Sequence, residues 1–167
     1  MLVLDWLTEK IQDFRALPDE DTTAILDFTL AWSFFEANIL NNNANTIKIR
    51  EVVESWQISN DGAQLADLEE HINYFADRYL RGENAINRFE HLNFRPNDGK
   101  KFVEDNLPNP EARATDRIIA LLIVIYRLRN NLFHGEKWAY GIHGQCDNFT
   151  HSTKALLTLL NTHLRQD

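Results

Sequence analysis

The chain has 167 residues, with 17 lysines and arginines against 25 aspartates and glutamates, and a formal net charge of −8. This length suits one domain with a single core, and a composition that is 44% hydrophobic and 11% aromatic excludes a disordered protein. The acidic charge argues against a protein that coats nucleic acid by bulk attraction, and a single cysteine excludes an intramolecular disulfide framework.

The N-terminal residues lack the features of a secretory signal, because no cationic segment precedes an apolar stretch. The longest apolar run, residues 118–126, is about half the roughly 20 residues that a membrane-spanning helix needs. A helix buried in a protein core explains this run better. We therefore expect a cytoplasmic protein with no membrane partner.

Apolar residues recur at helical spacing along most of the chain, which predicts an all-α protein. In chain order, the expected helices cover residues 2–17, 19–40, 46–58 and 63–80, a short segment at 102–107, and residues 110–133 and 148–164. Pro18 separates the first two helices, and the middle of the chain contains turns at residues 60–62 and 97–99. Residues 81–101 are less regular, and residues 136–147 are expected to form a loop.

Two residues predict where the longest helix begins. Asn109 is a good N-cap, and Pro110 is favoured as a first helical residue. Gly135 is a typical stop after the C-terminal end. Because no repeat or linker divides the chain, residues 1–167 are expected to form one domain, an antiparallel helical bundle.

Polar and cationic side chains crowd the end of this otherwise apolar helix: Arg127, Arg129, Asn130, Asn131 and His134. A helix C-terminus favours cations, so capping is one explanation. The same set also offers a fixed cation, amide groups and one group that titrates near neutral pH. Metal-free cleavage of RNA needs a base for the 2′-OH, an acid for the 5′-oxygen and a cation for the phosphate. A symmetric dimer that unites two copies of His134 would supply both proton transfers.

The string Arg129-Asn130-Asn131-Leu132-Phe133-His134 resembles the Arg-Asn-x-x-x-His motif of the HEPN (higher eukaryotes and prokaryotes nucleotide-binding) superfamily, and residues 126–135 are similar to its bacterial Apea-like members. The resemblance implies a bundle of four or more helices and a homodimer in which the two motifs meet. It implies a metal-independent endoribonuclease that acts on RNA, often as a toxin or phage-defence component, with a nucleotidyltransferase-like antitoxin as a partner. Arg129 and His134 would be catalytic, with Asn130 in support.

Such families also carry a polar or acidic residue on an early helix that faces the motif. The string Trp32-Ser33-Phe34-Phe35-Glu36 resembles that element, which makes Glu36 a further catalytic candidate. Residues 41–110 match nothing in the family and are expected to form a helical insertion. The alternative function is a non-catalytic HEPN module that binds RNA, a nucleotide or a protein partner.

The spacing of the motif leaves the identity of the catalytic cation open. Five residues at about 100° each place Arg129 and His134 about 140° apart on an ideal helix, whereas Arg127 shares a face with His134. Arg129 is favoured because an asparagine follows it directly, and Arg127 is the alternative. Arg127, Asn131 and Lys137 are also candidates for contact with the substrate.

No metal and no cofactor are expected. His134, His143, Cys146 and His151 lack the close Cys-x2-Cys or His-x3-His spacing that marks zinc sites. Other histidines, and two arginines early in the long helix, are interpreted as surface residues: His71, His91, His163, Arg113 and Arg117.

Overall fold

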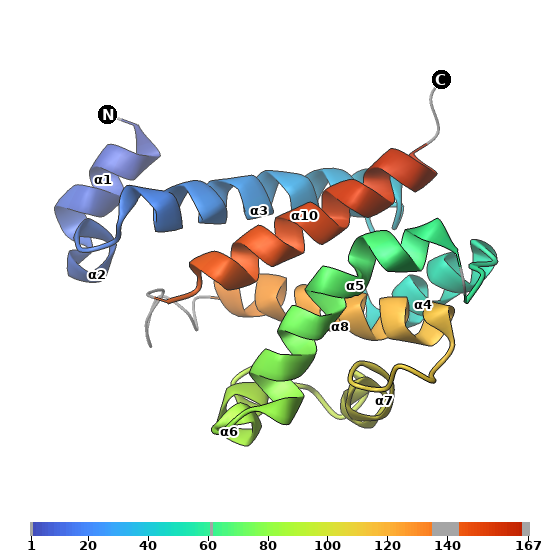
Figure 1. Ribbon diagram of the computed structural model, residues 1–167. Coiled ribbons are helices and arrows are strands. Elements are labelled where there is room, and N and C mark those ends of the chain that lie inside the picture. The colour runs from blue at the N-terminus through green and yellow to red at the C-terminus, as the bar shows by residue number, and fades with distance from the viewer. Residues whose placement is uncertain (1, 61, 135–143, 165–167) are drawn as a thin grey trace.

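The computed structural model describes residues 2–60, 62–134 and 144–164. All regular secondary structure within these ranges is helical, which confirms the predicted all-α bundle (Figure 1). The helices are α1 (Val3–Lys10), α2 (Gln12–Arg15), α3 (Asp19–Asn38), α4 (Thr46–Ser55), α5 (Ala63–Ala76), a π-helical extension of α5 called η1 (Asp77–Arg81), α6 (Ala85–Glu90), α7 (Lys100–Asn106), α8 (Ala114–Phe133) and α10 (Cys146–His163).

Helix α8 lies at the centre of the bundle. Its residues 118–125 are all buried, which explains why this run is apolar on every side of the helix rather than on one stripe. Helices α4, α5 and α7 contact α8, and α3 packs along α10. In Figure 1, α8 runs in the opposite direction to both α3 and α10, and α5 crosses it obliquely. Among the described residues, no helix combines the length and the hydropathy that crossing a membrane requires.

The segment between α3 and α8 shares the core of the bundle. Its buried side chains, which pack in the same cluster as those of α3, α8 and α10, include Ile49, Val53, Leu68, Ile72 and Val103. Helix α4 begins where Asn45 accepts a hydrogen bond from the Lys48 N–H at 2.8 Å, a side-chain N-cap. The less regular stretch before α7 contains the short helix α6.

Two predicted helix boundaries are wrong. The first predicted helix divides into α1 and α2, because Ile11 has an extended backbone. Helix α8 begins at Ala114, four residues after Pro110. Asn109 instead accepts the Glu111 N–H within a turn, and the Ala114 N–H donates to Asn60 Oδ1 at 2.7 Å. A side chain from a distant loop therefore caps this helix.

The two arginines near the start of α8 differ in their surroundings. Arg113 is exposed, as expected, and forms an ion pair with Asp116. Arg117 is buried, which contradicts the prediction of a solvent-exposed residue. Its two Nη atoms donate to the two carboxylate oxygens of Glu69 at 2.9 and 2.8 Å, a bidentate pair that ties α8 to α5.

Candidate functional site

Arg129 is the centre of a polar cluster on the side of α8 that faces α3. Its Nη2 lies 3.4 Å from Glu36 Oε2, and its Nη1 donates to Asn130 Oδ1 at 3.0 Å. The guanidinium also lies over the rings of Phe133 and Trp32, at 4.9 and 5.9 Å from their centroids. A carboxylate, an amide oxygen and two aromatic faces therefore fix this cation while 27% of its side chain stays exposed.

Glu36 is held in place by its own helix. Trp32 lies one turn earlier on α3 and donates its indole N–H to Glu36 Oε2 at 2.6 Å. This is the same oxygen that approaches Arg129, so the indole orients the carboxylate towards the guanidinium. The structure thus brings together Glu36 and Arg129, which lie 93 residues apart and which the resemblance to the HEPN motif implied would face each other.

Asn130 and His134 lie at the C-terminal end of α8. The Asn130 side chain is buried beside Arg129, and its backbone oxygen accepts the His134 N–H at 2.9 Å. His134 is the C-cap of the helix and is exposed. On an ideal helix, five residues at about 100° each place Arg129 and His134 about 140° apart.

Arg127 lies inside the protein. Only 4% of its side chain is exposed, and its Nη1 forms an ion pair with Asp98 at 2.8 Å. Its Nε donates to the Leu92 carbonyl at 3.0 Å, and its Nη2 to the Asn93 carbonyl. Every nitrogen of this guanidinium is engaged with the loop after α6. Arg127 is thus placed as a structural residue, away from the surface that Arg129 occupies.

Asn131 and Lys137 are the other two candidates for substrate contact. Asn131 is buried and donates its amide N–H to the His91 carbonyl at 2.9 Å, on the same side of α8 as Arg127. Lys137 lies outside the described residues, as does His143.

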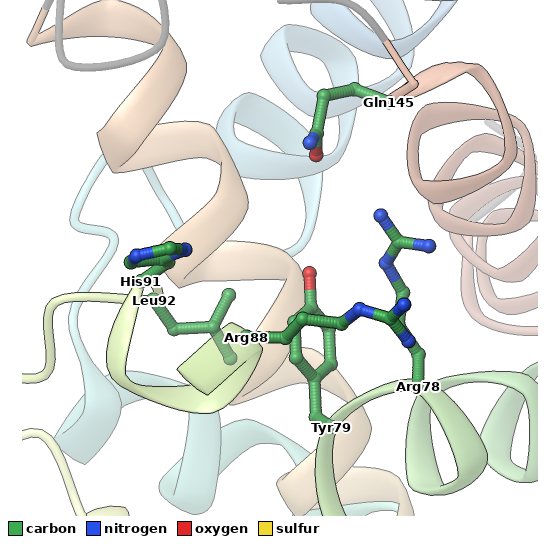
Figure 2. Close-up of a pocket in the computed structure, with 6 residues that line it drawn as sticks. All are labelled: Arg78, Tyr79, Arg88, His91, Leu92 and Gln145. Carbon is green, nitrogen blue, oxygen red and sulfur yellow. The ribbon is translucent and has the colours of Figure 1, made fainter. Parts of the chain in front are cut away.

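A second cationic site was not predicted from the sequence. A small cavity of about 40 Å³ opens between η1, α6 and the start of α10 (Figure 2). It is lined by Arg78, Tyr79, Arg88, His91, Leu92 and Gln145. This volume is room for about three waters or one small oxyanion. Arg78 Nε is buried without a hydrogen-bond partner among the described residues, while its Nη2 donates to the Gly144 carbonyl at 3.3 Å. The lining arginines come from separate helices, so no local sequence pattern indicates that they meet.

Two histidines that are 80 residues apart also meet. His71 on α5 and His151 on α10 have their Nδ1 atoms 2.8 Å apart. The prediction that His71 lies at the surface is wrong, because only 5% of it is exposed. His91 is exposed as expected, whereas His163 is half-buried and stacks on Trp56 with centroids 3.8 Å apart.

These histidines predict that the protein loses stability in acid. Burial lowers the pKa of His71, His151 and His163 below the ordinary value of 6.5. At pH values between the folded pKa values and 6.5, the unfolded chain therefore binds more protons than the folded chain. The contribution of these histidines to stability is full above this pH window and falls as the pH decreases through it. In EDTA, we expect a lower urea midpoint at about pH 5.5 than at about pH 7.5. A His151→Gln variant should show a smaller difference, and a midpoint that rises in acid would contradict the assignment.

The chain was compared with known families, curated proteins and solved structures. No family model matches the chain, and neither a curated protein nor a solved structure matches it.

Proposed function

We propose that this protein is a metal-independent endoribonuclease of the HEPN type. The observation that carries the proposal is the contact between Arg129 of the Arg-Asn-x-x-x-His string and Glu36 of the earlier helix. An oriented carboxylate, an asparagine and two rings hold this partly exposed cation at the end of α8. A preorganised guanidinium with open donors is suited to bind the oxygens of a phosphodiester.

The proposed reaction uses the two motif residues in separate roles. The neutral imidazole of one His134 accepts the proton of the 2′-OH, and the 2′-oxygen then attacks phosphorus. The bond from phosphorus to the 5′-oxygen breaks as the leaving oxygen takes a proton from a second, protonated His134. Arg129 stabilises the extra negative charge on the phosphorus oxygens. The products are a 2′,3′-cyclic phosphate and a 5′-OH end.

A homodimer is part of the proposal, because the reaction uses two imidazoles and each chain supplies one His134. A second copy would bring a second His134 into one cleft. Apolar side chains on the outside of α3 give such a partner a surface, since Leu26, Leu30 and Phe34 follow one another at four-residue spacing and are 40–70% exposed. Phe133, which contacts Arg129, is 52% exposed beside the motif. In the cell the protein would act as a toxin or phage-defence component held inactive by a nucleotidyltransferase-like antitoxin.

Cleavage in the absence of metal tests the proposal. Purified protein is incubated with single-stranded RNA of mixed sequence in excess EDTA, and the product ends are identified by mass spectrometry. We expect cleavage that depends on protein concentration and leaves 2′,3′-cyclic phosphates. No cleavage by the wild type, or cleavage that leaves 3′-OH ends, would contradict the proposed mechanism.

The second candidate function is a module that binds RNA or a nucleotide without cleaving it. The ion pair with Glu36 favours it, because the carboxylate offsets the charge of Arg129 in a protein whose net charge is already −8. This module would bind labelled RNA in a filter assay and leave it intact.

A further inference from the structure

The crossing of α5 and α10 brings a carboxylate and two imidazoles together. One ligand atom from each of Glu70, His71 and His151 lies within 4.8 Å of the others. The first two residues come from α5 and the third from α10, helices that pack against each other. This group is separate from Arg129 and Glu36, and the proposed ribonuclease does not use it.

The spacing of the two imidazoles is close to that of a metal site. Their Nδ1 atoms are 2.8 Å apart, a distance at which one hydrogen bond joins the rings in the absence of metal. In a tetrahedral zinc site, Zn–N bonds of about 2.0–2.1 Å place two ligand nitrogens about 3.3 Å apart. The two Nδ1 atoms would have to move apart by about half an ångström to admit the ion, and small side-chain rotations can supply this movement.

The surroundings of both rings favour the neutral imidazole, the form that binds a metal. Burial is the first cause that lowers the pKa of His71 and of His151. Lys154 acts in the same direction on both rings, whereas the Glu70 carboxylate acts against it. A neutral imidazole offers its lone pair to a metal without first losing a proton.

Aromatic neighbours fix the orientation of His151. The Tyr74 ring stacks on it with centroids 3.9 Å apart and 7° between planes, and Phe75 meets it edge-on at 6.5 Å. The Tyr74 hydroxyl donates to Asn148 Oδ1 at 2.9 Å, which anchors the stacked ring in turn. Side chains held in this way lose little further freedom when they bind a ligand.

We propose that Glu70, His71 and His151 bind one divalent ion of the zinc class. The two Nδ1 atoms and the Glu70 carboxylate would supply three ligands, and water the fourth, since Glu70 is exposed and opens the site to solvent. Imidazole ligands favour zinc over magnesium and calcium, which prefer sites made of oxygen atoms. The bound ion would join α5 to α10.

Zinc binding to the EDTA-treated full chain tests the site, and it is measured by isothermal titration calorimetry without RNA. The wild type should bind one zinc ion per chain and melt at a higher temperature with zinc than without it. Glu70→Gln, at an exposed position that leaves the fold intact, should weaken binding at least tenfold. His151→Ala should abolish it. Magnesium should give neither heat nor a shift in melting temperature.

His163→Ala is the matched control, because His163 lies on the same helix and stacks on Trp56 as His151 stacks on Tyr74. It should bind zinc as tightly as the wild type. Circular dichroism establishes that each variant is folded. A wild type that does not bind zinc would overturn the proposal, and so would zinc binding that Glu70→Gln and His151→Ala leave unchanged.

Discussion

An Arg127→Ala variant is expected to lose about 3–5 kcal/mol of folding free energy, the cost of removing one partner of a buried ion pair. The substitution leaves the Asp98 carboxylate, which is 14% exposed, without its cation. It also removes the donors that the Leu92 and Asn93 carbonyls receive from the guanidinium. Because these groups lie in the loop that α8 packs against, the loss of stability should extend from the loop to the central helix.

Urea denaturation followed by the fluorescence of the four tryptophans measures this effect. The matched control is Arg129→Ala, two residues along the same helix. The Arg129 ion pair is partly exposed, so this variant should lose no more than about 1 kcal/mol. Equal losses in the two variants would contradict the assignment of Arg127 as the structural arginine.

The largest effect on activity is expected at His134 and Arg129. If His134 transfers protons, His134→Ala should reduce RNA cleavage at least about 100-fold with little change in stability, because the side chain is exposed at a helix end. Arg129→Ala should reduce cleavage by a similar factor. Arg129→Lys should be intermediate, since lysine keeps the charge and loses the planar fork of donors. His163→Ala, at the C-terminal end of α10, should cleave like the wild type.

Mixing the two inactive variants tests whether the site is shared between copies. The proposed cleft uses the His134 of both chains, so a mixed dimer, which holds one His134 and one Arg129, lacks one of the two proton-transfer groups and the mixture should stay inactive. If one Arg129 and one His134 were enough for a site, half of the dimers would hold one complete site; recovery of about a quarter of the wild-type rate would therefore contradict the use of both histidines in one cleft. An active His134→Ala protein would contradict the ribonuclease mechanism as a whole.

The helices were predictable where burial alone sets the pattern of apolar residues. The uniformly apolar run at residues 118–125 predicts a buried helix, and α8 is that helix. Helix ends were less predictable, because caps do not have to be local. Asn109 and Pro110 form a good local start signal, yet α8 starts later, where Asn60 from another loop receives its first N–H group.

Helical spacing alone showed that Arg127 and Arg129 point in different directions, but it could not say which direction is inward. That choice depends on the loop after α6, whose carbonyls and Asp98 surround Arg127. It also depends on α3, which brings Glu36 to Arg129. Local helix chemistry accommodates both arginines equally well. Only contacts with neighbouring segments determine that Arg127 is buried and that Arg129 is partly exposed.

The sequence by itself determined that this is an all-α protein, that α8 is a buried helix and that polar groups gather where α8 ends, since each of these follows from the spacing of side chains along the chain. Only the tertiary structure decided that Arg127 is internal and that His71 meets His151 across 80 residues. Contacts between distant segments depend on how helices cross, and crossing geometry is set by the packing of the whole core.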